Sequence, residues 1–300
     1  MYPREFDYYR AKTVAEAIAL LEEHRFEETE LLAGGHSLIP TMKTGLAAPD
    51  IVIDIGHIDE LNGIVDDGGH FSIGALTNYD AVASSRPLRE RTPAFAEAAA
   101  AVGDVQVRNR GTVGGNIAHA DPASDLPGAA LVSEAVIVVR GPDGERTVPA
   151  DEFFMGMYMT DVQPDELLTH IELPALDAVG SGGAYVKRAS PSSGFAIVGV
   201  AAVLEIADDT IRTARVAATG VLDHAVRLPA VERSLVGAAA TPETIADAAE
   251  HADDSLDAAL IMEDIHASGE FRQQLLNVYT ERALESAAER ADVGSRPNSR

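Results

Sequence analysis

Cysteine and tryptophan are absent from this 300-residue chain. Without cysteine the chain forms no disulfide, no thiolate zinc site and no cysteine-linked flavin, and it cannot hold an iron–sulfur cluster through the usual thiolates. The sequence also lacks an apolar run long enough to span a bilayer, and its start lacks the apolar segment of a signal peptide. We therefore expect a cytoplasmic protein without a membrane span.

Positive charge is scarce as well. The chain has 23 Lys and Arg residues against 48 Asp and Glu, a formal net charge of −25. Lysine occurs only at Lys12, Lys43 and Lys187. This balance argues against nucleic acid or an anionic membrane surface as a partner. An acidic, lysine-poor surface is typical of a halophile-like protein, because concentrated salt screens the self-repulsion; the alternative is an ordinary acidic bacterial protein.

Local patterns predict a chain of mixed helices and strands. Thr13 and Glu16 form a capping box that opens a helix, and Gly141–Gly144 between two β-branched runs predicts a hairpin. The other predicted elements are strands at 31–32, 51–55, 71–75, 167–173, 184–187, 196–206 and 211–220, with helices at 94–102, from 242 and at 270–288. The glycine- and alanine-rich stretch 175–183 is the best candidate for a domain boundary. Strands and helices without strict βαβ alternation favour an α+β architecture.

Two short glycine turns are the most informative motifs. Ala33–Ser37 reads AGGHS and Thr112–Asn116 reads TVGGN. Adjacent glycines permit positive φ and close approach, and successive N–H groups form an anion-binding nest. Ser37, Thr112 and Asn116 add side-chain donors. Two facing turns would fit a pyrophosphate, and hence a dinucleotide, whereas either one alone is more often a simple tight turn. Neither the G-x-G-x-x-G fingerprint nor a P-loop is present.

The sequence around these turns resembles the FAD-binding medium subunit of the molybdenum hydroxylase family, which includes xanthine dehydrogenases and aerobic carbon monoxide dehydrogenases; the likeness is closest to the carbon monoxide dehydrogenase type. The second turn continues into Ala118–Pro127, AHADPASDLP, as it does in that family. Further segments match in the same order, and only the last dozen or so residues fall outside. These segments are Phe6–Tyr8, Ala15–Ala17, Asp54–Ile55, Ile73–Thr77, Asp165–Leu168, Ala184–Lys187, Ala218–Val221 and Asp264–Ser268.

The resemblance implies a particular domain organisation. Residues 1–176 would form a two-subdomain, PCMH-type FAD-binding domain, with a small α/β subdomain at 1–56 and a larger α+β subdomain at 57–176. A C-terminal domain of one sheet plus helices would span 182–288. Residues 289–300 are polar and are expected to form a disordered tail.

The resemblance also implies noncovalent binding of FAD between these parts. Asp125 matches an aspartate that contacts the cofactor, and Lys187 matches a cationic contact near the flavin ring. The residues so predicted to bind the cofactor are Ala33, Gly34, Gly35, His36, Ser37, Leu38, Thr112, Val113, Gly114, Gly115, Asn116, Asp125, Leu168 and Lys187.

Each side chain in this region also has a structural interpretation. Asp121 and Asp125 have the position of carboxylates at a helix start, and Lys187 could be an ordinary surface lysine. Phe195 is suited either to stacking on the flavin ring or to core packing. His36 and His119 beside the two turns are more typical of packing or hydrogen-bonding residues.

Three further patterns bear on catalysis and partner contacts. Arg108 and Arg110 flank the second turn and could serve the pyrophosphate or an ion pair with a partner chain. No spacing typical of metal ligands is present, and no nucleophile signature is present. We therefore assign neither a metal site nor a catalytic residue.

The resemblance implies the role of an oxidoreductase subunit. Substrate would be oxidised at a molybdopterin-binding large subunit, and electrons would pass from [2Fe–2S] clusters of a small subunit through FAD to an external acceptor. The complex would be a dimer of heterotrimers. The substrate stays open between carbon monoxide, an aldehyde, a purine and another heterocycle. The electron acceptor stays open between quinone, NAD and oxygen. The alternatives are a stand-alone FAD oxidoreductase of the same fold and a non-enzymatic flavin-binding or assembly protein.

Overall fold

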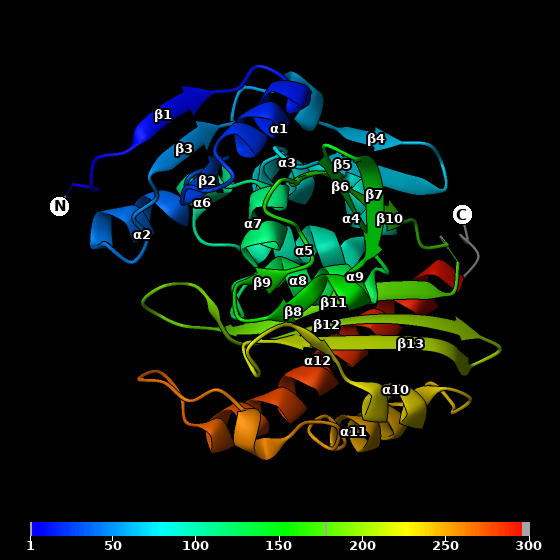
Figure 1. The fold of residues 1–300 in the computed structure, drawn as a ribbon. Coiled ribbons are helices and arrows are strands. Elements are labelled where there is room, and N and C mark those ends of the chain that lie inside the picture. The colour runs from blue at the N-terminus through cyan, green and yellow to red at the C-terminus, as the bar shows by residue number, and fades with distance from the viewer. Residues whose placement is uncertain (1, 178, 296–300) are drawn as a thin grey trace.

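The computed structural model describes residues 2–177 and 179–295, and it arranges them in three stacked parts (Figure 1). The N-terminal part is a parallel sheet of order β1-β3-β2. Its strands are β1 (Asp7–Arg10), β2 (Thr29–Leu32) and β3 (Ile51–Asp54), with helices α1 (Val14–Glu23) and α2 (Leu38–Thr44). The predicted cap at the start of α1 is confirmed, because the Thr13 side chain accepts a hydrogen bond from the Glu16 N–H at 3.1 Å.

The middle part is a five-stranded sheet of order β4-β5-β10-β6-β7. Its strands are β4 (Ile64–Asp66), β5 (His70–Gly74), β6 (Val136–Gly141), β7 (Gly144–Pro149) and β10 (Leu167–Pro174). Gly141 pairs with Gly144, which confirms the predicted hairpin. The helices of this part are α3 (Tyr79–Ser84), α4 (Arg86–Arg91), α5 (Pro93–Ala101), α6 (Val105–Arg108), α7 (Val113–His119), α8 (Asp125–Val132) and α9 (Ala150–Phe153). A small hairpin follows α9, made of β8 (Phe154–Gly156) and β9 (Met159–Thr160).

The C-terminal part is an antiparallel sheet of order β11-β12-β13-β14. Its elements are β11 (Ser181–Ala189), β12 (Ala196–Ala207), β13 (Thr210–Thr219), β14 (Val226–Arg227), α10 (Pro229–Leu235), α11 (Pro242–Ala249) and α12 (Gly269–Ser295). Alternate side chains of β12 belong to different cores: Ala201 and Val203 join the core of the middle part, and Val200 and Leu204 join the core under α12. Because successive side chains of a strand point to opposite faces, this sheet joins two of the three parts.

Two features of the C-terminal part differ from the sequence-based expectation. Strand β11 begins at Ser181, inside the predicted boundary stretch 175–183. A Cβ on Gly182 would collide with the Ala287 carbonyl oxygen, so the glycine there allows close packing of α12 and is not part of a linker. Helix α12 also continues past the predicted end at residue 288 to Ser295, and residues 296–300 of the predicted tail lie outside the described residues.

Each of the three parts has its own buried cluster of apolar side chains. The mixed helices and sheets thus confirm the predicted α+β class. Across the described residues, none of the helices combines the length and the apolar character that crossing a membrane requires.

Candidate functional site

The two glycine segments lie directly against each other. A Cβ on Gly34 would lie 2.5 Å from the Arg110 carbonyl oxygen and 3.2 Å from the Thr112 nitrogen. A Cβ on Gly115 would lie 3.8 Å from the Ala33 Cβ. Any side chain at Gly34 would push the segments apart, so glycine is required there by close packing. The fold therefore brings together the two motifs singled out in the sequence.

The first segment presents a row of free backbone donors. Gly35 has φ +74, a left-handed conformation that favours glycine. In the described part of the chain, no acceptor is bonded to the N–H groups of residues 34–38. Ser37 precedes α2 without making a side-chain cap bond, and His36 beside it is exposed. Successive free N–H groups at such a turn suit an anionic oxygen such as that of a phosphate.

The second segment differs from the expectation. It is the first turn of α7 and not a nest, because its N–H groups already have partners inside the protein. Val113 and Gly114 donate to the carbonyls of Thr77 and Ala75, and Gly115 donates to the Thr112 side chain. A threonine that caps a helix uses its oxygen for this bond, and a Cβ on Gly114 would overlap Ala75.

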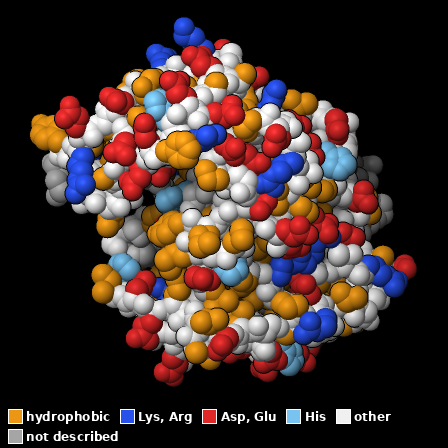
Figure 2. Space-filling model, viewed as in Figure 1, with side chains coloured by type: hydrophobic (Ala, Val, Ile, Leu, Met, Phe, Trp, Pro, Cys, Tyr) orange, Lys and Arg blue, Asp and Glu red, His pale blue; other side chains and the backbone are white. Residues whose placement is uncertain are grey.

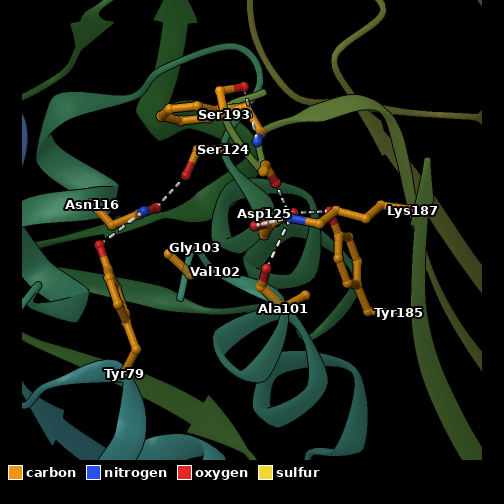
Figure 3. Close-up of polar contacts among 12 residues, drawn as sticks. Tyr79, Ala101, Val102, Gly103, Asn116, Ser124, Asp125, Tyr185, Lys187 and Ser193 are labelled. Atoms are coloured by element: carbon orange, nitrogen blue, oxygen red, sulfur yellow. Dashed lines mark hydrogen bonds and ion pairs between the residues drawn. The ribbon is translucent and has the colours of Figure 1, made fainter. Parts of the chain in front are cut away.

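Asn116 also makes internal contacts. Its Nδ2 donates to the Tyr79 hydroxyl at 3.1 Å, and its Oδ1 accepts from the Ser124 hydroxyl at 2.6 Å (Figure 3). Burial raises the pKa of Tyr79 to about 12, so this hydroxyl stays protonated at any physiological pH. The Asn116 amide thus joins α3, α7 and the start of α8.

Asp125 and Lys187 bind each other in the buried centre of the site (Figure 3). Lys187 Nζ donates to Asp125 Oδ2 at 2.8 Å, to the Ala101 carbonyl at 2.9 Å and to the Gly194 carbonyl at 2.7 Å. All three ammonium protons therefore have acceptors. The interpretation of Lys187 as a surface residue is wrong, because its side chain is only 9% exposed.

Tyr185 completes this cluster, and the sequence analysis had not singled it out. Its hydroxyl donates to Asp125 Oδ1 at 2.5 Å. Burial raises the pKa of Asp125, and the nearby Lys187 and Tyr185 act in the opposite direction. Burial beside Asp125 likewise raises the pKa of the Tyr185 hydroxyl. A sequence signal existed, since Tyr185 and Lys187 alternate on one strand and so share a face.

Lys187 also fixes the loop that joins β11 to β12. By donating to the Gly194 carbonyl, Lys187 holds the residue next to Phe195 against α5 and α8, where its other two acceptors lie. The Phe195 side chain is 46% exposed, so core packing is excluded and the ring remains available for a ligand or partner. Leu168, by contrast, is buried in the core of the middle part.

The remaining polar candidates occupy structural positions. Arg108 donates to the carbonyls of Val102 and Gly103, and Asp121 Oδ1 accepts from the Ala123 N–H in a local turn. His119 packs against Tyr158 with ring centroids 5.0 Å apart. Burial lowers the pKa of His119, while Asp121 opposes the shift. Within the described residues, no cluster of three or more His, Asp or Glu side chains is suited to hold a metal ion.

A cavity of ≈ 160 Å³ lies next to these residues. Asp121, Tyr158 and Phe195 line it together with side chains from the start of β12 and from the loop before α12. Ala120 and Tyr158 both have positive φ, 48° and 56°. Such conformations cost about 1–3 kcal/mol each in a residue other than glycine and cluster at functional sites.

Comparisons with known proteins show the family of the chain. A family described as "FAD binding domain in molybdopterin dehydrogenase" matches residues 4–176, and "CO dehydrogenase flavoprotein C-terminal domain" matches residues 184–287. The chain is 40% identical to the carbon monoxide dehydrogenase medium chain of Hydrogenophaga pseudoflava over 96% of this chain and 98% of that one. It is 35% identical to the glyceraldehyde dehydrogenase medium chain of Sulfolobus acidocaldarius, over 96% and 100% of the two chains.

Solved structures give the same result. The chain superposes on carbon monoxide dehydrogenase from Hydrogenophaga pseudoflava with a TM-score of 0.92 and 41% identity. That match covers 97% of this chain and 99% of the other. The agreement includes both the FAD-binding region and the C-terminal sheet.

Proposed function

This chain belongs to the family of FAD-binding medium subunits of carbon monoxide dehydrogenase-type molybdenum hydroxylases, and from that premise we propose that it relays electrons from a partner's [2Fe–2S] clusters to an external acceptor. The observation that supports a relay is the absence of cysteine from the whole sequence. Iron–sulfur clusters are held by cysteine thiolates. A subunit of this family without cysteine needs a second chain to bring electrons to it.

The proposed partners follow from the names of the relatives. Both the carbon monoxide dehydrogenase and the glyceraldehyde dehydrogenase relatives are called medium chains, a name that implies a larger and a smaller companion. We assign the molybdopterin to the large subunit and the [2Fe–2S] clusters to the small one, in a dimer of heterotrimers. These two relatives share similar identity with this chain but are named for different substrates. The substrate is therefore selected outside this subunit.

The residues of the site fit FAD. The free N–H groups of residues 34–38 suit the pyrophosphate, and the adjoining helix starts with no acidic residue in its first turn. The predicted contacts of Thr112, Asn116 and Leu168 with the cofactor remain part of this proposal. Bound FAD supplies a centre that accepts electrons one at a time and releases them in pairs.

In this proposal Asp125 and Lys187 position the flavin-binding surface. Their ion pair ties β11 to α8, and the bond to Gly194 holds the Phe195 ring at the edge of the site. The ion pair is nearly neutral as a unit, so it adds little net charge to the site. The chain offers binding and orientation, and no side chain is assigned to proton abstraction.

Anaerobic mixing of the isolated, FAD-loaded chain with reducing organic molecules tests this function. Carbon monoxide, aldehydes and purines should leave the oxidised-flavin absorbance unchanged, because the chain has no centre that oxidises them. Rapid bleaching by any one of them, without other subunits, would instead identify a stand-alone oxidoreductase.

A further inference from the structure

A small hairpin displays methionines on the surface of the middle part. We call the tip of β8 and β9, residues Met155–Met159, the methionine hairpin. Its base is held by Phe153 and Phe154, which are buried and pack edge to face with ring centroids 5.3 Å apart. The side chains of the tip are exposed; Met159, for example, is 58% accessible. Figure 2 shows hydrophobic side chains gathered over β8 and β9 in the middle of the view.

A second exposed apolar group lies on the loop before α12. Ile265 is 96% exposed, yet the loop around it is braced. Asp264 Oδ1 accepts from the backbone N–H groups of His266 and Ala267 at 2.8 and 3.0 Å. Its Oδ2 accepts from the buried Arg272 at 2.7 Å. A fully exposed isoleucine on a fixed loop is preorganised to meet another surface, since little conformational entropy remains to be lost.

The cavity of ≈ 160 Å³ lies between these two elements. Met157 and Tyr158 line it from the methionine hairpin, and Met262 lines it from the loop of Ile265. A cavity of roughly 150 Å³ holds a group the size of benzene. Asp121 also lines it, and among the described residues the only hydrogen bond to its Oδ2 is a long one of 3.4 Å from Tyr158. Arg272 lines the cavity too, but its guanidinium already donates to Asp264 and to the carbonyls of Ile197 and Gly220. The cavity therefore fits one side chain with an apolar stem and a cationic end that reaches Asp121, such as arginine.

We propose that the methionine hairpin, the Ile265 loop and the cavity between them form the docking surface for the [2Fe–2S] subunit. This proposal rests on the proposed function. This docking surface borders the candidate cofactor site. Phe195 lines the cavity, and Lys187 of the site holds the loop that carries Phe195. Electron transfer requires the cluster and the flavin to lie close together, so the cluster-bearing partner is the occupant expected beside that site.

The chemistry of the surface agrees with this occupant. Methionine and aromatic side chains are enriched at the centres of protein interfaces, and pocket-filling anchors supply much of the binding energy. The chain has a net charge of −25, so a partner with basic residues around an apolar centre is complementary to it. The large subunit and a second copy of this chain are the competing occupants.

Binding of the purified [2Fe–2S] subunit to the full-length, FAD-loaded chain tests the proposal. Met157→Asp and Ile265→Asp each place a charge on the surface while leaving the buried residues intact. Val65→Asp is the matched control, since Val65 is 65% exposed on β4, outside the docking surface. Affinity is measured by surface plasmon resonance, and FAD content and melting temperature are measured on every variant.

The two variants should bind the [2Fe–2S] subunit about tenfold or more weakly, a loss of about 1.4 kcal/mol, with FAD content and melting temperature unchanged. The control should bind as the unaltered chain does. The proposal would be overturned if all three variants bound with equal affinity or if the unaltered chain did not bind. It would also be overturned if the variants lost only binding to the large subunit or only self-association. Normal docking without flavin reduction would contradict the relay alone, so the two proposals fail separately.

Discussion

Replacing Lys187 with methionine should destabilise the fold strongly. The methionine keeps most of the apolar stem but removes the cation that balances Asp125. Both side chains of this pair are nearly buried, at 9% and 5% exposure, so water does little to screen the loss. Breaking a buried ion pair by removing one partner costs about 3–5 kcal/mol. We expect the melting temperature to fall by on the order of 10 °C.

The loss of folding stability in Lys187→Met should also depend on pH. Burial raises the pKa of Asp125, and without Lys187 that rise is opposed only by Tyr185, so the pKa increases further. A carboxyl group with a higher pKa in the folded state stabilises the fold while it stays protonated, and this stabilisation is lost as pH rises toward the folded pKa. The gap between Lys187→Met and the unaltered chain should therefore widen once pH rises above the folded pKa of Asp125 in the unaltered chain, which burial raises above the ordinary value of about 4.

Urea unfolding at several pH values measures this effect. The exposed Lys43 provides a matched control, and Lys43→Met should change stability by no more than about 0.5 kcal/mol. Adding Asp125→Asn to Lys187→Met should recover part of the loss, because it removes the unpaired charge. A Lys187→Met protein as stable as the unaltered chain at neutral pH would refute the reasoning.

Three further predictions concern the cofactor loop and its support. Gly35→Val should abolish FAD binding because the strained residue and its new side chain, which meets Ile39, lie among the free N–H groups of residues 34–38, whereas Gly45→Val, with φ +79 and open space around it, should keep FAD despite similar backbone strain; equal flavin content in both would contradict this. Asn116→Ala should cost about 1–3 kcal/mol in urea unfolding, since its two partners lose their bonds; an unchanged midpoint would argue against the network. Acid precipitation should release all FAD, because a chain without cysteine has no thioether link to it; flavin in the pellet would show a covalent bond.

Sequence patterns predicted those features that depend on neighbouring residues. The cap at Thr13 and the hairpin at residues 141–144 involve contacts only a few positions apart, and both are confirmed. The two glycine motifs were expected to face each other, and they meet in the structure. The order of strands and helices predicted the α+β class, and the resemblance to a known family supplied the cofactor.

Features that depend on distant residues were missed or misread. Asp125 and Lys187 are 62 positions apart, and nothing local indicates that they pair. The TVGGN motif looked like a nest, but the Thr112 cap turns it into a helix start whose donors are satisfied. Gly182 looked like part of a linker, but it is required by the approach of Ala287 from α12.

Rapid mixing with a reduced [2Fe–2S] subunit tests the central claim most directly. The small subunit is reduced with dithionite, freed of excess reductant and mixed anaerobically with the FAD-loaded chain. The account predicts prompt loss of the oxidised-flavin absorbance together with reoxidation of the clusters. Reduced clusters that leave the flavin oxidised would contradict the proposal that this chain is an electron relay.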